Sequence, residues 1–329
     1  MTSHWMLKTH GDPLAATQRF LGALFRTAGL DALLAPLRVG ELPSVEPRVL
    51  HDAAQMGDLD PFAPLMMVNA AGLAAQYLKA HPDHALGVVL RPCEIRALRE
   101  VAAREALATE RLLIVGVDCV GTFSAEDFAW RGGAEPLVRE ALQFVRQGGV
   151  AVYRYRLACR LCTDPMPQGV HLTVDLLGLP TRQVILLTAR DEETAGRLNL
   201  ASLTDGPAPA ALIGQHQRVL AATVARREHV RRRILEALHT DLAADVEALL
   251  AHLIDCAPCR ECILACPIAS SDPQLHTGIP TREAVTNWLA ACAGCGMCQE
   301  ACPQHLPLAA IFARLHDRLE ALLSDPVSV

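Results

Sequence analysis

Two stretches near the carboxyl end decide how this chain folds and what it can bind: CAPCRECILACP (256–267) and CAGCGMCQEACP (292–303). Each has the spacing C-x2-C-x2-C-x3-C and is followed by a proline. This spacing is typical of thiolate runs that hold 4Fe–4S clusters, in which the fourth cysteine serves the other cluster of a pair. Three cysteines on one tight loop can reach three irons of a cube, whereas the fourth leaves that loop.

We therefore assign these cysteines to two 4Fe–4S clusters that exchange their fourth ligands. One cluster is expected on Cys256, Cys259, Cys262 and Cys302, and the other on Cys292, Cys295, Cys298 and Cys266. Zinc sites and disulfides are the alternatives. Zinc sites made of four thiolates are usually built from two separated C-x2–4-C pairs, and such tight spacing in a cytosolic chain indicates metal binding rather than cross-linking.

A βαβ unit is predicted in the middle of the chain. The apolar run GVVL (87–90) predicts a buried strand, residues 94–108 predict a helix, and LLIVGV (112–117) predicts the next strand. Strands joined in this way are parallel, so their carboxyl ends meet at the same edge of the sheet. Open α/β sheets bind their ligands at that edge.

The four remaining cysteines belong to this region. Cys93 and Cys119 each follow a predicted strand, and Cys93 also opens a helix, where the helix dipole favours a thiolate. Cys159 and Cys162 form a C-x2-C pair that would complete a four-thiolate site. The residues predict a third 4Fe–4S cluster on these four cysteines; a zinc site, or four unrelated buried or surface thiols, are the alternatives.

The rest of the first 210 residues predicts an α/β (α+β) domain with a mixed sheet. Residues 20–37 are rich in alanine and leucine and predict a helix, as do residues 134–147. Further strands are predicted at 150–157, 170–176 and 183–188.

Residues 211–329 predict a second, all-helical ferredoxin-like domain that carries the two cluster motifs. A long helix is expected over about 211–255, because leucines recur every three or four residues in its second half. Residues 281–291 predict a helix with Thr281 as its N-cap, and another apolar stripe follows Pro303. Helices, not strands, should hold the cluster loops.

Composition excludes several classes of function. The chain has 329 residues, is 51% hydrophobic and carries a net charge of −6, so no global basic field indicates nucleic-acid binding. No apolar run approaches the length of a membrane span, and the first residues do not resemble a signal peptide. We expect a cytoplasmic protein. The dinucleotide, P-loop, nucleophile-elbow and zinc-protease motifs are absent from the sequence.

Several polar residues could support the clusters. Residues beside the middle cysteines could orient the thiolates through hydrogen bonds, although capping and turn formation explain most of them equally well: Glu94, Arg96, Asp118, Thr122 and Asp164. His305 could tune a cluster or simply be a loop histidine. The arginines at 226, 227, 231, 232 and 233 could bind an acidic partner or an anionic lipid surface, or form a solvated helix face.

Three segments together resemble the β subunits of deazaflavin-reducing hydrogenases and formate dehydrogenases: RPCEIRAL (91–98), GVDCVGT (116–122) and CRLCTD (159–164). In that family the matching cysteines bind a 4Fe–4S cluster, which implies this role for Cys93, Cys119, Cys159 and Cys162. The segment VDLLG (174–178) stands where the family has an acidic-glycine element. The carboxyl-terminal part resembles the two-cluster tail of formate dehydrogenase β subunits and the helical ferredoxin subunits of heterodisulfide reductases.

The resemblance implies an iron–sulfur electron-transfer subunit whose catalytic partner is a formate dehydrogenase, a hydrogenase or a heterodisulfide reductase-like assembly. Family members typically bind FAD through a glycine-rich turn, and the comparable region here, MVNAAG (67–72), has no glycine pair. The alternative function is a flavin-containing oxidoreductase subunit that exchanges hydride with a deazaflavin. A redox-sensing iron–sulfur scaffold is a third hypothesis. No residue of the chain indicates that it activates formate or hydrogen itself.

Overall fold

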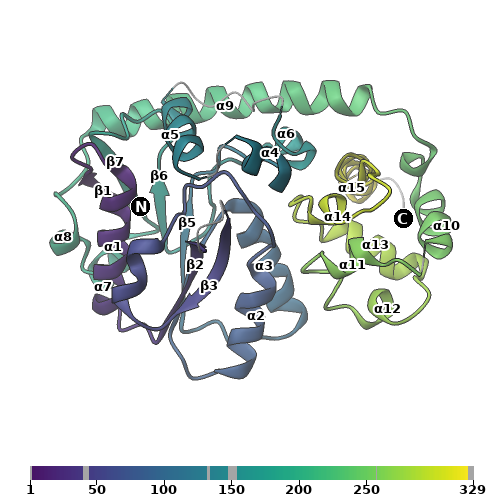
Figure 1. The fold of residues 1–329 in the computed structure, drawn as a ribbon, viewed down its shortest axis with the longest axis horizontal. Helices are drawn as coiled ribbons and strands as arrows, with labels where there is room; N and C mark the ends of the chain where they lie inside the picture. Colours follow the sequence, from purple (N-terminus) through teal and green to yellow (C-terminus); the bar gives the residue numbers. More distant parts are fainter. Residues whose placement is uncertain (1, 40–43, 132–133, 147–153, 257, 325–329) are drawn as a thin grey trace.

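The computed structural model describes residues 2–39, 44–131, 134–146, 154–256 and 258–324. In these residues a seven-stranded mixed sheet occupies the amino-terminal half and a helical region follows it (Figure 1). The expected fold class is therefore confirmed. In spatial order the strands are β1 (Ser3–Lys8), β7 (Val184–Ala189), β6 (Leu172–Asp175), β5 (Leu112–Val117), β4 (Leu86–Leu90), β2 (Ala32–Arg38) and β3 (Val45–Leu50).

The centre of the sheet is parallel and its two sides are antiparallel. β2, β4, β5 and β6 run in the same direction, whereas β7 is antiparallel to β6, β1 to β7, and β3 to β2. The predicted βαβ unit is present as β4, α3 and β5. The carboxyl ends of β4 and β5 consequently lie next to each other, which places the residues that follow them at one edge.

Both faces of the sheet are buried. Leu86, Val88 and Leu90 of β4 pack with helices on one face, and Val89 packs on the opposite face, as the two-residue period of a strand requires. α2 and α3 cover the first face and α1 covers the second. The helices of this half are α1 (Pro13–Thr27), η1 (Ala53–Asp58), α2 (Ala71–Ala80), α3 (Pro92–Arg104), α4 (Ala125–Trp130), α5 (Ala134–Val145), α6 (Leu157–Leu161), α7 (Glu192–Arg197) and α8 (Leu200–Leu203).

A long helix, α9 (Ala210–Glu236), runs from the sheet to the helical region (Figure 1). Within the described residues, no strand follows β7. The remaining elements are η2 (Asp241–Ala243), α10 (Val246–Asp255), α11 (Glu261–Leu264), α12 (Pro273–His276), α13 (Arg282–Ala290), α14 (Met297–Glu300) and α15 (Leu308–Ser324). As expected, Thr281 caps α13 by accepting the backbone N–H of Ala284 (3.2 Å).

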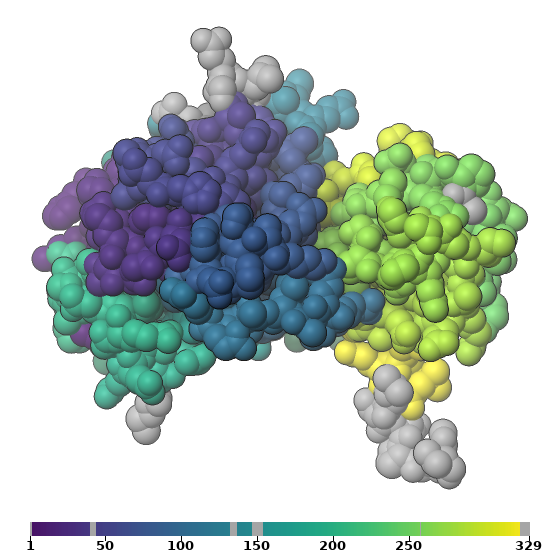
Figure 2. Space-filling view, turned by 90° about the horizontal axis from the view of Figure 1, so that it is seen from below, coloured from purple at the N-terminus to yellow at the C-terminus, as the bar shows by residue number. Residues whose placement is uncertain are grey.

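The two halves form neighbouring lobes that share one hydrophobic core (Figure 2). The same cluster of buried side chains includes Leu98 of α3, Trp288 of α13 and Phe312 of α15. Arg96 of α3 also donates to the carbonyl of Ala293 (2.9 Å). The division into domains at 1–210 and 211–329 stays a prediction, because α9 begins near that boundary but His216 in its first part donates to the carbonyl of Leu177, in the loop after β6 (2.8 Å). None of the helices in the described part of the chain is both long and apolar enough to cross a bilayer.

Two predicted elements are wrong in part. Residues 20–37 are not one helix, because Gly29 adopts a φ of +60° after α1 and the chain then re-enters the sheet as β2. The predicted strand at 150–157 lies partly outside the described residues. In its described part, Arg156 instead caps α6 and its backbone N–H donates to the carbonyl of Thr122 (3.0 Å).

The predicted long helix over 211–255 is also wrong, because α9 ends at Glu236 and α10 begins at Val246. The break has no glycine or proline, and the leucine pattern continues through it. Local caps make the turn: the Thr240 hydroxyl accepts the N–H of Leu242 (3.4 Å), and the Asp245 carboxylate accepts the N–H of Ala248 (2.8 Å). β1, β2 and β3 were not predicted from the sequence.

The junction between the lobes should be sensitive to one methyl group at Gly296. A Cβ at this position would lie 2.3 Å from the Cβ of Ala158 in α6, and the residue has a φ of +73°. We expect Gly296→Ala to lower the free energy of unfolding by about 2–4 kcal/mol through backbone strain and overpacking. Urea unfolding followed by circular dichroism under argon would measure the loss.

Gly294→Ala is the matched control, because Gly294 has a φ of +65° but no atom within 4 Å of the added Cβ. This variant should lose only the strain energy, about 1 kcal/mol. Equal losses in the two variants would contradict the close approach of α6 to the second cysteine loop.

Candidate functional site

The first cysteine loop lies between α10 and α11. Cys256 is the C-cap of α10, and Arg260 adopts a φ of +50° before α11 begins. The Arg260 guanidinium donates to the carbonyls of His276 (2.6 Å) and Gly278 (2.8 Å). These bonds fix the loop against the segment that follows α12.

Cys302, from the second cysteine run, lies beside the cysteines of this first loop. Burial raises the pKa of Cys262 to about 12, with smaller contributions from the thiols of Cys256, Cys302 and Cys259. Burial also raises the pKa of Cys256, and Cys259 and Cys302 add to it. The structure thus brings together the four residues that the sequence assigned to one set.

Cys266, from the first run, lies with the second loop in the same manner. Burial and the thiol of Cys295 raise the pKa of Cys266 to about 11. Burial raises the pKa of Cys298 well above its ordinary value, and the thiols of Cys292, Cys266 and Cys295 add to that effect. The two runs therefore exchange their fourth cysteines in space.

Hydrogen-bond donors point at sulfur atoms of the second set. The indole Nε1–H of Trp288 in α13 donates to Cys266 Sγ (3.3 Å), and both groups are buried. The backbone N–H of Gly294 donates to Cys292 Sγ (3.5 Å). Donors of this kind stabilise negative charge on sulfur.

The middle set gathers at the carboxyl edge of the parallel strands. Cys93 is in the first turn of α3, Cys119 follows β5, and Cys159 and Cys162 lie at α6. Burial raises the pKa of Cys119 to about 11, and the thiol of Cys159 is the next largest cause. Burial also raises the pKa of Cys93 strongly, with contributions from Glu94, Cys119 and then Cys295.

The sulfur atoms are too far apart for zinc as they stand. A tetrahedral four-thiolate zinc site, with Zn–S bonds of about 2.3 Å, holds its sulfur atoms ~3.8 Å from one another. Within the described residues, which include all twelve cysteines, no three Sγ atoms all lie within 4.8 Å of one another. None of the twelve cysteines forms a disulfide.

The middle and second sets are neighbours across the junction. Cys93 packs against Cys295, Met297 and Met66 in one small hydrophobic cluster. A cavity of about 440 Å³ is lined by Cys162 from the sheet lobe and by Cys292 and Cys298 from the helical lobe. The second set therefore lies between the middle set and the first.

Arg96 lies between the middle and second sets. Its guanidinium pairs with Asp164 (3.2 Å) and donates to the Ala293 carbonyl (2.9 Å). Burial alone would lower the pKa of Arg96, but negative charge on Cys162 and Cys93 outweighs burial and raises it. Arg96 is thus placed to offset negative charge on the sulfur atoms.

The other polar residues that were predicted beside the middle cysteines have different partners. The hydroxyl and backbone N–H of Thr122 both lie 3.3 Å from Cys159 Sγ. Glu94 instead caps α3, because its carboxylate accepts the backbone N–H groups of Arg91 (2.9 Å) and Ala70 (3.2 Å). The carboxylate of Asp118 accepts the N–H groups of two residues after β6.

The arginine-rich part of α9 is not simply a solvated face. Arg227 is buried and donates to the carbonyl of Cys119 (3.0 Å). Arg231 donates to the carbonyl of Leu161 (3.4 Å) and pairs with Asp317 of α15. His305, by contrast, is an exposed loop residue with a φ of +52°.

Two buried arginines and a tryptophan near the cysteines were not predicted as site residues. Arg156 donates to the Thr122 hydroxyl (2.8 Å) and lies 3.5 Å from Met297 Sδ, and Arg227 and Trp288 have the contacts described above. No spacing in the sequence connects these residues to the cysteines. Only the position of Trp288 between the two cysteine runs could have indicated its role.

A second group of titratable residues lies next to the middle set, where Asp118, Asp175 and His216 are all buried. Burial raises the pKa of Asp175 to about 7, and the Asp118 carboxylate adds to that rise. Burial also raises the pKa of Asp118. It would lower the pKa of His216, but the two carboxylates outweigh burial and raise it. The group therefore requires a proton or another cation.

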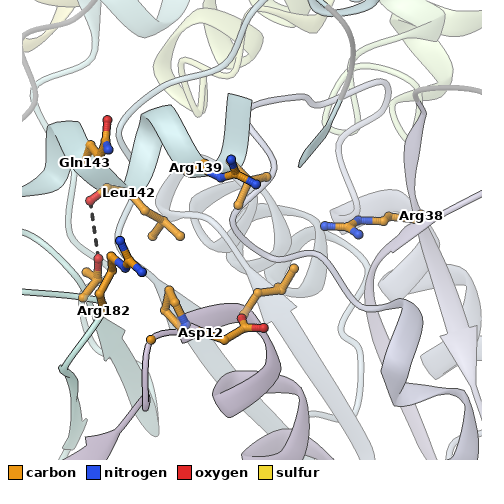
Figure 3. A pocket seen from close by; sticks show the side chains of 11 residues that line it. Asp12, Arg38, Arg139, Leu142, Gln143 and Arg182 are labelled. Carbon is orange, nitrogen blue, oxygen red and sulfur yellow. Dashed lines mark hydrogen bonds between the residues drawn. The ribbon is translucent and has the colours of Figure 1, made fainter. Parts of the chain in front are cut away.

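A cavity of about 520 Å³ opens beside α5 and is also lined by the start of α1, by Arg38 at the end of β2 and by Thr181 and Arg182 before β7 (Figure 3). Arg38 and Arg182 extend toward it from opposite sides, and Arg139 lies between them. Arg38 also pairs with the buried carboxylate of Asp60 (2.8 Å). The guanidinium groups suit an anionic ligand such as the phosphates of a nucleotide cofactor.

No protein-family model matches the chain. Among solved structures, the chain is similar to one from the xenon-derivatised F420-reducing NiFe hydrogenase complex of Methanosarcina barkeri. The TM-score is 0.53 at 11% sequence identity, and the match covers 72% of this chain and 91% of that chain. At this identity the similarity shows a shared fold.

Proposed function

We propose that this chain is an iron–sulfur electron-transfer subunit of a multisubunit redox complex and that it holds three 4Fe–4S clusters. The observation that carries the proposal is the gathering of cysteines from distant parts of the sequence, four at a time, with Cys266 and Cys302 exchanged between the two runs. Four thiolates are the ligand set of a cubane, and exchange of the fourth cysteine is typical of two-cluster ferredoxins.

The proximity of the thiols supports metal binding, because thiols that raise one another's pKa lie close enough to share a metal core. A buried thiol keeps its proton near neutral pH unless a cation takes the proton's place. The irons of a cluster would supply that positive charge. The donors from Thr122, Gly294 and Trp288 then stabilise the charge that remains on sulfur.

The contacts define an order along which electrons would move. Cys93 of the middle set contacts Cys295 of the second set, and the thiol of Cys262 in the first set acts on the pKa of Cys298 in the second. The order is therefore middle, second, first. The part played by the protein is to space the clusters, exclude water and tune their potentials.

The substrate reaction would take place on a partner. A formate dehydrogenase, a hydrogenase or a heterodisulfide reductase-like catalytic subunit fits the sequence resemblance, and the similar solved chain comes from a hydrogenase complex. The site residues proposed here are cysteines and their hydrogen-bond donors, and none is placed to activate formate or hydrogen.

The proposal predicts about twelve irons per chain, from four irons per cubane. Cys93→Ser should lower this value to about eight and remove the spectroscopic signal of one cluster. Iron and sulfide analysis of protein purified under argon would measure both. Cys256→Ser, the matched comparison, should remove a different cluster signal. About eight irons in the unmodified protein would remove the middle cluster from the proposal.

Trp288→Phe should lower the reduction potential of the second cluster, because the indole N–H stabilises the more negative, reduced form. A shift on the order of tens of millivolts is expected for loss of one hydrogen bond to charged sulfur. Redox titration followed by electron paramagnetic resonance (EPR) would measure it. Trp130→Phe is the control, because Trp130 is 74% exposed. An unchanged potential in Trp288→Phe would argue against Cys266 as a cluster ligand.

A flavin-containing subunit that exchanges hydride with a deazaflavin is the second candidate. The cavity with three arginines favours it, because an FAD pyrophosphate carries the matching charge. This cavity lies beside a smaller cavity that is lined by Cys119, because Leu142 lines both. A bound flavin would therefore have a route to the middle cluster.

Native purification under argon followed by flavin extraction tests this candidate. If it is correct, the protein carries one flavin per chain, and Arg182→Ala weakens flavin binding about tenfold or more through loss of a charge-assisted hydrogen bond. Arg190→Ala is the control, because Arg190 is an exposed residue that pairs with Asp191. Absence of flavin, with iron content intact, would leave only the electron-transfer role.

A further inference from the structure

Three ligand atoms of the kind that bind metals converge at a point where two strands and a helix meet. Asp118 follows β5, Asp175 ends β6, and His216 lies in α9. One ligand atom from each residue lies within 4.8 Å of the other two. The residues are 5%, 2% and 6% exposed, so the group is inside the protein.

In each of the two carboxylates, one oxygen accepts hydrogen bonds that fix the orientation of the group. Asp118 Oδ2 accepts the backbone N–H groups of Leu176 (2.8 Å) and Leu177 (2.9 Å). Asp175 Oδ2 accepts the hydroxyl of Thr188. Such bonds orient a carboxylate and leave its second oxygen available for a metal.

The imidazole is held in the same manner. Nδ1 of His216 lies 2.8 Å from the carbonyl of Leu177, so this nitrogen carries the proton and donates it. Nε2 is then the nitrogen that faces the carboxylates, at 4.0 Å from Asp175 Oδ1. Metal-binding histidines typically donate their second ring N–H to a backbone carbonyl or a carboxylate.

Within the described part of the chain, the free carboxylate oxygen of Asp118 and Nε2 of His216 lack the hydrogen-bond partners that buried polar atoms normally have. Asp118 Oδ1 is buried, and no hydrogen-bond partner for it is present in the described residues. The distance of 4.0 Å between His216 Nε2 and Asp175 Oδ1 is too long for a hydrogen bond. The buried guanidinium of Arg227 is close enough for its charge to act on Asp118, but it donates to the carbonyl of Cys119 and gives Asp118 Oδ1 no hydrogen bond. A buried carboxylate oxygen without a donor is costly, and a cation would satisfy it.

We propose that Asp118, Asp175 and His216 bind one divalent first-row transition-metal ion, at a site distinct from the three cysteine sets. Two carboxylate oxygens and one imidazole nitrogen suit zinc or manganese, and three protein ligands leave a position for water. The absence of sulfur from the ligand set separates this ion from the irons held by cysteine.

The ion connects three elements that are distant in the sequence. It joins the ends of β5 and β6 to α9, the helix that runs on to the helical lobe (Figure 1). It also places two positive charges one residue from Cys119. The site stands on its own residues and does not rest on the proposed electron-transfer function.

Manganese(II) is the appropriate probe, because it prefers oxygen and nitrogen ligands and competes poorly for thiolates. Protein purified under argon with its iron intact is treated with a chelator, desalted and titrated with Mn²⁺. The free ion has a six-line EPR signal that is lost on binding. Plasma mass spectrometry counts any zinc or other native metal that the chelator leaves. We expect one non-iron ion per chain, native and added metal together.

Asp175→Asn and His216→Gln should each weaken Mn²⁺ binding at least tenfold with unchanged iron content. His171→Gln is the matched control. This half-buried histidine accepts the N–H of Ile114 (3.0 Å) at the opposite end of β6. It should bind Mn²⁺ as the unmodified protein does.

A measurement on the unmodified protein guards against variants that fail to fold. Pulsed EPR of the bound Mn²⁺ should show coupling to one imidazole nitrogen. The proposal is overturned if no non-iron ion is found, if the nitrogen coupling is absent, or if both variants bind Mn²⁺ as tightly as the control. If no non-iron ion is found, a proton shared by Asp118, Asp175 and His216 takes the place of the metal.

Discussion

In the proposed function, sulfur atoms that lie buried beside one another carry negative charge, and the rest of the structure depends on how that charge is offset. Burial raises the pKa of Cys119, Cys266 and Cys262, and neighbouring thiols raise it further. Buried arginines and N–H and O–H donors that point at sulfur offset this charge. Arg156 illustrates the balance: burial would lower its pKa, but negative charge on Cys159 and Glu300 outweighs burial and raises it. In the proposed function, the irons would supply the positive charge that allows these buried thiols to ionise.

The hydrophobic core that the two lobes share keeps the cysteine sets in fixed positions relative to one another. The helical lobe does not hang from a linker, because α3, α13 and α15 contribute to one hydrophobic cluster and Gly296 lies directly against α6. A small hinge motion would separate Cys93 from Cys295, and close packing opposes it. The lobes therefore behave as one support for the cysteine sets, although their elements come from opposite ends of the chain.

The sequence was sufficient where a local rule applied and insufficient where the fold decided. Cysteine spacing predicted which residues gather, and the βαβ unit placed Cys93 and Cys119 at the correct edge. Residues 32–37 fall within a predicted helix because alanine and leucine favour helices, but they form most of β2, an inner strand that is buried on both faces. The sequence does not indicate the break after Glu236, because single threonine and aspartate residues cap the helices there and no glycine or proline marks the turn. Arg156, Arg227 and His216 reach the site only through tertiary contacts, so no periodicity or spacing could indicate them.

In the proposed two-cluster arrangement, the exchange of Cys266 and Cys302 between the two runs constrains how the protein is made. The first run is synthesised before Cys302, so Cys256, Cys259 and Cys262 are present before the fourth cysteine of their set. The second loop, in turn, needs Cys266 from the earlier run to be already in place. In that arrangement, neither cluster has its full ligand set until both runs have been synthesised. A chain cut between the two runs would lose both centres, not one.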